Sequence, residues 1–241
     1  TAGGVMHEGL VSLVLGLKGM PAAGEEVMIG RDIALAEVTG GRLHVMHVST
    51  AGGVALVRAA KARGVRVTAE ACPHHFTLTD ENLRGFDSNF KMSPPLRTAA
   101  DVDAIIEGII DGTIDCIATD HAPHALEKKM LEIDRAPFGI LGLETAVGLS
   151  VTRLVEPGRI GWPRLIEAMS TLPARILGIK RGTLRPGAPA DITLIDPSLQ
   201  WRVDVHSFAS KSVNSPFHGW TLQGRAVATI VAGRVKYRLP R

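Results

Sequence analysis

The sequence predicts a parallel α/β fold followed by a small β-rich appendage. Between residues 28 and 180, segments with apolar residues at helical spacing alternate with short segments rich in apolar and β-branched residues. Repeated strand, loop and helix units of this kind imply a parallel sheet. After residue 181, turns rich in Gly and Pro separate short strands instead. We therefore expect two domains, residues 1–180 and residues 181–241.

The expected helices begin and end at recognisable signals. Residues 28–39 end at Gly40-Gly41, and residues 52–63 end at Gly64. Residues 99–111 place a row of isoleucines on one face, which is typical of a helix packed on a sheet. Shorter helices are expected from residue 80, at 143–154, at 162–170 and at 173–177, where Pro173 would break a continuous helix.

The expected strands are short. Residues 65–70 are β-branched and alternate in polarity, and residues 115–119 form a largely apolar run. This periodicity fits a barrel or a doubly wound sheet, and it does not choose between them. Further strands are expected at 43–48 and 89–92, and in the appendage at 191–195 and 226–231.

The composition argues against several classes of function. Hydrophobic residues make up 45% of the chain and charged residues 21%, as in ordinary soluble globular proteins. The net charge is only +3 and the basic residues are scattered, so we expect no nucleic-acid partner. No apolar run reaches the length of a membrane span. Cys72 and Cys116 lie in apolar segments, which favours buried thiols in a reducing cytoplasm over a disulfide.

Polar side chains gather in three loops that follow expected strands, where parallel α/β proteins carry their functional groups. Because strand side chains alternate, His44 and His47 should point to opposite faces, and His47 is the better ligand candidate. A lone strand histidine is, however, more often a hydrogen-bonded core residue. His74 and His75 are adjacent and cannot both face one site from an extended backbone, so we expect structural or supporting roles for them.

The third loop holds Asp120, His121 and His124 directly after the apolar residues 115–119. Asp120 could bind a metal or move a proton, and His124, displaced by an Ala-Pro turn, could reach over the site. The alternative is that Asp120 caps the next helix and the imidazoles are solvated. Imidazole and carboxylate are the usual ligands of catalytic Zn²⁺, which would explain why these groups occur together.

Five motifs carry further information. They are His47-Val48-Ser49-Thr50, Pro73-His74-His75, Lys91-Met92-Ser93-Pro94-Pro95-Leu96-Arg97, Ala118-Thr119-Asp120-His121-Ala122-Pro123-His124 and Pro137-Phe138-Gly139. With these motifs the chain resembles the dihydroorotases of the amidohydrolase superfamily, in the bacterial class with a large β/α barrel. The resemblance runs over essentially the whole chain, and it is more specific for this branch of the superfamily than for the substrate.

The resemblance implies the C-terminal portion of a metal-dependent (β/α)8 TIM barrel with a small β-sandwich-like appendage. It implies one or two Zn²⁺ ions in the complete site, with His47 and Asp120 as metal ligands. Asp120 would also be the general acid and base. The expected substrate contacts are Ser93, His124, Phe138 and Gly139.

The implied reaction is the reversible interconversion of N-carbamoyl-L-aspartate and (S)-dihydroorotate in pyrimidine biosynthesis. A small-molecule substrate and a cytoplasmic location follow from that reaction. The resemblance also implies a homo-oligomer or a complex with aspartate transcarbamoylase.

Two departures from the family bear on these expectations. Ser93 stands where the family usually has Asn, and hydantoinases often carry Ser there, so a hydantoinase or dihydropyrimidinase is the alternative activity. The family's His-x-His pair, bridging carboxylate and further His ligand have no counterpart in this sequence. We therefore expect the 241 residues, which begin with Thr1, to be a fragment of a chain of about 420 residues and to be inactive alone. A catalytically dead homologue that scaffolds a transcarbamoylase is the third interpretation.

Overall fold

The computed structural model describes residues 3–240, which form two compact units. The first unit runs to Glu144 and includes Val205–Pro216, and the second comprises Thr145–Asp204 and the chain from Phe217 onward. The division predicted between residues 180 and 181 rests on the character of the sequence, and it stays a prediction.

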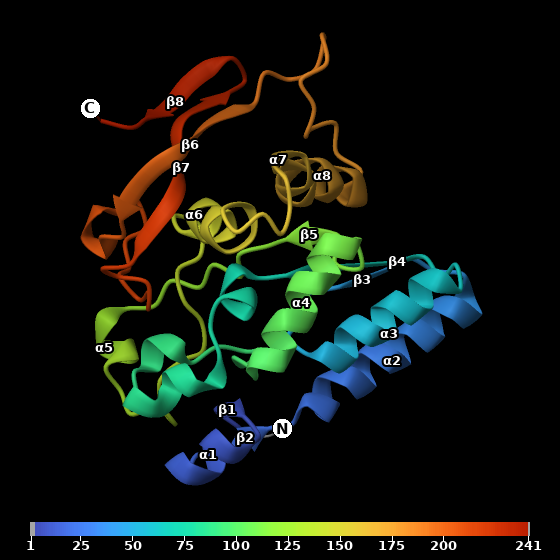
Figure 1. The fold of residues 1–241 in the computed structure, drawn as a ribbon, viewed down its shortest axis with the longest axis vertical. Coiled ribbons are helices and arrows are strands. Elements are labelled where there is room, and N and C mark those ends of the chain that lie inside the picture. The colour runs from blue at the N-terminus through green and yellow to red at the C-terminus, as the bar shows by residue number, and fades with distance from the viewer. Residues whose placement is uncertain (1–2, 241) are drawn as a thin grey trace. The chain divides into compact units, whose positions relative to one another are not determined.

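A parallel three-stranded sheet lies at the centre of the first unit (Figure 1). Its strand order is β3-β4-β5, and helices connect the strands as the sequence predicts. Figure 1 shows α2 and α3 side by side, and these two helices are in contact. Because the strands are parallel, their carboxyl ends lie at one edge of the sheet. The elements are α2 (Ala22–Thr39), β3 (Leu43–Val45), α3 (Ala51–Ala62), β4 (Val67–Ala71), α4 (Ala99–Asp111) and β5 (Cys116–Ile117).

Burial alternates along β4. Val67, Ala69 and Ala71 are buried, whereas Thr68 and Glu70 are half-buried on the other face of the strand. The connecting helix α3 contacts β4 and presents buried apolar residues of its own. Glu70 is therefore placed near the carboxyl end of β4 on the polar face of the sheet.

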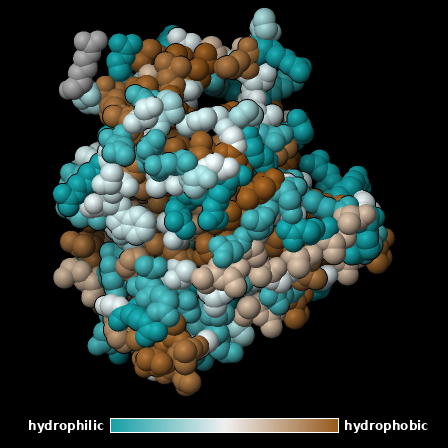
Figure 2. Space-filling model, in the orientation of Figure 1, coloured by the Kyte–Doolittle hydropathy of each residue, from teal (hydrophilic) through white to brown (hydrophobic). Residues whose placement is uncertain are grey.

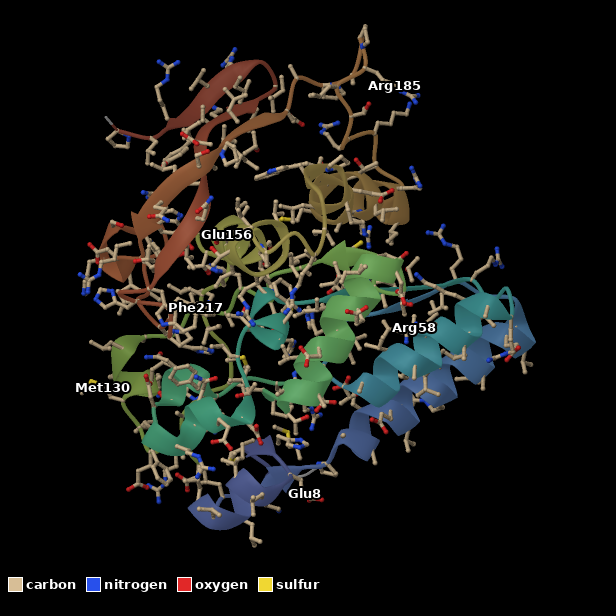
Figure 3. The ribbon with its side chains drawn as sticks, in the orientation of Figure 1. Glu8, Arg58, Met130, Glu156, Arg185 and Phe217 are labelled. Atoms are coloured by element: carbon tan, nitrogen blue, oxygen red, sulfur yellow. The ribbon has the colours of Figure 1, made fainter. Side chains whose placement is uncertain are left out.

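Local sequence signals account for the helix ends. α2 begins at Ala22, earlier than the predicted residue 28, directly after Pro21, whose backbone is extended with φ −64° and ψ 144°. Thr98 caps α4 in a capping box, in which the Asp101 carboxylate accepts the Thr98 N–H at 3.1 Å. The predicted limits of α4 are confirmed. Arg58 on α3 pairs with Asp111 at the end of α4, with 2.7 Å between nitrogen and oxygen (Figure 3).

The strand predicted at residues 89–92 is wrong. The chain there forms the 3-10 helix η3 (Ser88–Phe90), and the Asp87 side chain accepts the Asn89 N–H at 2.8 Å. This local hydrogen bond competes with the ladder bonds that a strand would need. The apolar pattern reflects instead the burial of Met92, together with the alkyl chain of Lys91, in an irregular segment.

The first residues of the chain hold three short elements that the sequence pattern did not predict. β1 and β2 pair in parallel, and α1 lies between them in the chain. α1 exposes Leu10, Leu13 and Val14. This helix lies at the lower edge of Figure 1, where Figure 2 shows an apolar surface in the same orientation. The remaining elements of this unit are β1 (Met6–His7), α1 (Leu10–Leu15), β2 (Gly19–Met20), η1 (Pro73–Phe76), η2 (Asp80–Gly85), α5 (Leu126–Lys129) and η6 (Val205–Ser207).

The second unit contains helical turns and an antiparallel sheet of order β6-β7-β8. The strands predicted at 191–195 and 226–231 lie, apart from residue 191, within longer strands. Gly224 has φ +79°, and a Cβ there would lie 2.8 Å from Val151 Cγ2, so glycine permits close packing at this point. The elements are α6 (Ala146–Ser150), η4 (Val151–Val155), α7 (Trp162–Ile166), η5 (Glu167–Thr171), α8 (Leu172–Leu177), β6 (Ile192–Arg202), β7 (Thr221–Val231) and β8 (Arg234–Arg238).

The short helix predicted at residues 173–177 is present as α8, but no break precedes it. Helical residues run from α7 through the π-turn η5 directly into α8, with Pro173 as the second residue of α8. Proline lacks an N–H and crowds the carbonyl four residues earlier, so a regular α-helix cannot pass through it. The wider π-turn accommodates that irregularity. Within residues 3–240, no helix is both long and apolar enough to cross a membrane.

Candidate metal and substrate site

His47 and Asp120 meet beyond the carboxyl ends of β3 and β5. His47 Nε2 lies 3.7 Å from Asp120 Oδ1, and the two side chains are 19% and 34% exposed. Both residues have left-handed backbones, with φ of 54° for His47 and 46° for Asp120. Left-handed non-glycine residues are uncommon and cluster at functional sites. The two left-handed turns bring these side chains together from separate loops.

Glu70 holds His47 from the opposite side of the imidazole ring. His47 Nδ1 donates to Glu70 Oε1 at 3.0 Å, and His44 Nε2 donates to Glu70 Oε2 at 3.1 Å. Burial disfavours the charge of Glu70, but the hydrogen bonds from His44 and His47 outweigh it and lower the pKa of Glu70 to about 2. The hydrogen bond between His47 and Glu70 also raises the pKa of His47. Glu70 is therefore a carboxylate that fixes both histidines.

The expectation that His44 and His47 point to opposite faces is wrong. It assumed a continuous strand from residue 43 to residue 48, but β3 ends at Val45. His47 lies beyond the strand in the left-handed conformation, so the alternation of strand side chains no longer applies to it. Both histidines consequently reach the same carboxylate.

The donor set at His47 and Asp120 fits a metal ion. The Glu70 bond occupies Nδ1 of His47 and leaves Nε2 directed at the Asp120 carboxylate. Metal-binding histidines commonly donate their other N–H to a carboxylate, which sets the tautomer and the orientation of the ring. An imidazole nitrogen and a carboxylate oxygen 3.7 Å apart could both reach one ion with small movements. These two residues could thus supply part of a metal's coordination sphere.

His124 follows Asp120 closely in the sequence, and it contacts the loop that contains Phe138 and Gly139. His124 Nε2 lies 2.8 Å from the Phe138 carbonyl oxygen, and its backbone N–H donates to Asn214 Oδ1 at 3.1 Å. Gly139 has φ +110°, and a Cβ there would lie 2.5 Å from Ala122 Cβ. The loop before Ile140 therefore requires glycine at position 139.

Two buried lysines hold the same loop by its carbonyl groups. Lys91 Nζ donates to Ala136 O at 2.7 Å and to Asp134 O at 3.1 Å. Lys129 Nζ donates to Pro137 O at 3.0 Å and to Gly139 O at 3.1 Å. Burial lowers the pKa of Lys129 to about 8. The adjacent Met130 is 75% exposed and points outward (Figure 3), so α5 buries Lys129 selectively.

Ser93 and His121 have different surroundings from the loop residues. Ser93 is exposed and precedes Pro94 through a cis peptide bond. His121 Nδ1 accepts the Gly142 N–H at 3.1 Å, which gives this imidazole a structural role. The structure thus brings together His47 with Asp120, and His124 with the Phe138 loop, while Ser93 makes no hydrogen bond or ion pair to either group within residues 3–240.

The premise used for His74 and His75 is also wrong. The backbone at these residues is not extended, because both belong to η1, which begins at Pro73. Both imidazoles are buried, and their ring centroids lie 4.2 Å apart in an edge-to-face arrangement. The tight turn therefore does not direct the two side chains to opposite faces, as an extended strand would.

Sequence reasoning assigned no role to Glu70, Lys91, Lys129 or Asn214. A signal for Glu70 was present, since it ends a strand on the face of Thr68, where an alternating pattern places a polar residue. Lys129 gave no signal, because Leu126-Glu127-Lys128-Lys129 has the composition of a solvated turn.

An imidazole and a carboxylate at the strand ends of a parallel α/β unit are groups that can bind a catalytic metal ion. The comparison with known families agrees, because the model described as "Amidohydrolase family" matches residues 24–236. The chain belongs to the amidohydrolase family, whose members use metal ions.

Curated relatives share more than half of their residues with the chain over the aligned region. A protein from Pelotomaculum thermopropionicum named dihydroorotase is 62% identical over 98% of this chain and 55% of its own length. A second, from Geobacter metallireducens, is 57% identical over the same shares. The chain therefore spans about half the length of the curated relatives it matches.

Solved structures give the same fold. An L-hydantoinase (dihydropyrimidinase) from Arthrobacter aurescens matches with a TM-score of 0.85 and 32% identity, over 90% of this chain and 49% of its own. A dihydropyrimidinase from Brevibacillus agri matches with a TM-score of 0.86 and 27% identity over the same shares. The predicted fold class, α/β of the amidohydrolase barrel type with a separate β-sheet region, is confirmed.

Proposed function

We propose that the chain carries part of the catalytic site of a dihydroorotase, which interconverts N-carbamoyl-L-aspartate and (S)-dihydroorotate. The observation that carries this proposal is the His47–Asp120 pair, 3.7 Å apart, with Glu70 behind the imidazole. Relatives at 52–62% identity that are named dihydroorotase support the choice of substrate.

In this proposal His47 and Asp120 bind Zn²⁺, which supplies Lewis acidity toward the ring amide carbonyl when it is bound. Asp120 accepts a proton from the attacking water at a carboxylate oxygen. It then delivers that proton to the ring nitrogen as the amide bond breaks. Glu70 keeps the His47 ring in one orientation throughout.

The loop at Phe138 and Gly139 binds the substrate in this proposal. The Phe138 carbonyl accepts a hydrogen bond from His124 Nε2, so His124 Nδ1 is the nitrogen that remains to meet a substrate. When both ring nitrogens carry protons, Nδ1 can donate to the substrate carboxylate. Ser93, which is exposed, would add a hydroxyl contact.

The test is an assay of the zinc-loaded enzyme expressed from its complete gene, with dihydroorotate and with a hydantoin as separate substrates. We expect turnover of dihydroorotate, and a loss of at least 100-fold in Asp120→Asn. Asp103→Asn, at an exposed position of α4, is the matched control and should keep full activity. The 241-residue chain alone should turn over neither substrate. Hydrolysis of the hydantoin alone would reject a dihydroorotase.

The second candidate is a hydantoinase or dihydropyrimidinase. Ser93 favours it, as do the names of the solved structures that match the chain. A catalytically dead scaffold is the third, and it predicts no turnover of either substrate by the zinc-loaded complete enzyme. The same assay therefore separates all three.

We also propose a cytoplasmic location. Within residues 3–240, Cys72 and Cys116 are both buried and neither forms a disulfide, which accords with a reducing compartment. An association with a second copy or with aspartate transcarbamoylase stays a prediction from the resemblance.

A further inference from the structure

We propose that Cys72, His74 and His75 form a second cation site, distinct from the His47–Asp120 pair, which takes a zinc-class ion. One donor atom from each of the three residues lies within 4.8 Å of the other two. All three side chains are buried, with exposed fractions of 0%, 3% and 3%.

The backbone explains why three consecutive donors can converge. Cys72 directly follows β4 with an extended backbone, and Pro73 then begins the tight 3-10 turn of η1. The turn carries His74 and His75 back toward the thiol. A Cys-Pro-His-His segment on a continuing strand would have directed neighbouring side chains to opposite faces.

Two nitrogen atoms at this position have no hydrogen-bond partner among residues 3–240. They are His74 Nε2 and His75 Nδ1, and both are fully buried. A buried polar atom that is left unsatisfied costs about 1–3 kcal/mol, so native structures seldom keep two of them on adjacent residues. A cation between them would satisfy both.

A hydrogen bond fixes the tautomer of His75 and leaves its other ring nitrogen able to bind a cation. His75 Nε2 lies 3.0 Å from the Pro94 carbonyl oxygen, which can only accept, so Nε2 carries the proton. Nδ1 therefore carries the lone pair. A carbonyl behind the imidazole is a usual support for a metal-binding histidine.

The charge state of the cluster also suits a cation. Burial lowers the pKa of His75 to about 4 and holds the pKa of His74 well below its usual value, so both rings are neutral at pH 7. A divalent ion would form a bond to Sγ and release the thiol proton to solvent, one proton for each ion bound.

The site lies on a different side of His47 from Asp120. Cys72 Sγ is 3.4 Å from His47 Nδ1, whereas Asp120 approaches His47 Nε2. The donor sets differ as well, because only the proposed site contains sulfur. One thiolate with two imidazoles selects zinc, cobalt or cadmium over magnesium or calcium.

The donor atoms need only small movements to bind such an ion. In a tetrahedral site with Zn–S near 2.3 Å and Zn–N near 2.0–2.1 Å, the ligand atoms lie roughly 3.3–3.8 Å apart. Three protein ligands leave a fourth position open. The distances between donor atoms must therefore shorten by about 1.5 Å at most, which side-chain rotation can supply.

The sulfur makes the test specific. Co²⁺ is added to the purified, reduced chain, and the near-ultraviolet absorption of sulfur-to-cobalt charge transfer is recorded. We expect this band in the unmodified chain and in Cys116→Ser, the matched control at the other buried cysteine. We expect its loss in Cys72→Ser. Absence of the band from the unmodified chain, or its persistence in Cys72→Ser, would overturn the proposal.

Circular dichroism verifies that each variant is folded. If Cys72→Ser does not fold, zinc X-ray absorption on the unmodified chain decides the question. One sulfur at about 2.3 Å from zinc supports the site, and a shell of nitrogen and oxygen alone refutes it. These readouts are independent of turnover, so the proposed activity can fail while the site stands.

Discussion

His47 lies between two carboxylates, with Nε2 3.7 Å from Asp120 Oδ1 and Nδ1 3.0 Å from Glu70 Oε1. One nitrogen is engaged by a residue on the sheet and the other is directed at a loop residue. The position of Asp120 relative to the imidazole therefore depends on how firmly Glu70 holds the ring. A change at Glu70 should therefore alter the affinity of the proposed site for a metal ion, although Glu70 does not itself contact that ion.

The first prediction is that Glu70→Gln weakens zinc binding by about 10–100-fold, the usual effect of removing a carboxylate that supports a ligand histidine. Glutamine keeps the size of the side chain but cannot accept from His44 and His47 with equal strength. Zinc affinity is measured by competition with a chromophoric chelator, in a Cys72→Ser background so that the thiol contributes nothing.

The control for this prediction is Glu107→Gln, which changes an exposed carboxyl group of α4. Its zinc affinity should equal that of the parent chain. If Glu70→Gln bound zinc as tightly as Glu107→Gln, the Glu70 bond would be incidental to the metal site.

The second prediction concerns Lys129 and pH. Its folded pKa is about 8, and the ordinary lysine pKa is about 10.4. Between these values the unfolded chain binds more protons than the folded chain, so the free energy of unfolding rises with pH in this window. The contribution is fully present above pH 10.4 and lost as the pH falls through 8, and it amounts to about 3 kcal/mol.

Lys129→Met removes that titration, and Lys128→Met, at the exposed neighbouring position, does not. Urea unfolding at pH 7 and pH 10 should show the parent chain and Lys128→Met gaining stability relative to Lys129→Met as the pH rises. Parallel pH profiles for all three proteins would show that Lys129 is solvated in solution.

Residues with strong local signals were predictable from the sequence. The limits of α4 follow from the Thr98 capping box and from Gly112, whose φ of 80° ends the helix. The absence of a strand at residues 89–92 was not predictable, since the Asp87 side chain replaces a ladder bond by a local one. The spacing of apolar residues does not show whether a backbone N–H bonds to a neighbouring strand or to a nearby side chain.

The sequence predicted which residues belong to the candidate site, but not their backbone conformations or their contacts. Asp120 and His47 stand in motifs, but their left-handed backbones have no counterpart in a pattern of strand alternation. The convergence of His44 and His47 on Glu70 depends on β3 ending at Val45. The burial of Lys129 depends on carbonyl groups from a loop that the sequence places beyond α5.

The third prediction tests the segment that follows His47. Glu25 on α2 accepts the Ser49 N–H at 2.8 Å and the Thr50 N–H at 3.2 Å, and Arg97 Nη2 lies 3.4 Å from its carboxylate. The Arg97 side chain is only 3% exposed. Glu25→Ala leaves that buried charge without a counter-charge, so we expect a loss of about 3–5 kcal/mol in the free energy of unfolding.

The control is Glu37→Ala on the same helix. Glu37 pairs with Arg63 at 3.2 Å, but both side chains are about half exposed. A surface pair of this kind contributes about 0–1 kcal/mol. Equal losses in the two variants, measured by urea unfolding, would mean that Arg97 is hydrated once Glu25 is gone.

The fourth prediction is that Gly139→Ala displaces the Phe138 loop and destabilises the chain by about 1–3 kcal/mol, because φ +110° is a region that side chains rarely adopt. The new methyl group would also meet Ala122 Cβ at 2.5 Å. Gly30→Ala in α2 is the matched control, since a Cβ there meets nothing within 4 Å, and it should stabilise the helix by about 0.5–1 kcal/mol. In the complete zinc-loaded enzyme, displacement of the loop should raise KM for dihydroorotate more than it lowers kcat. An unchanged KM in a destabilised Gly139→Ala protein would separate the loop's structural role from substrate binding.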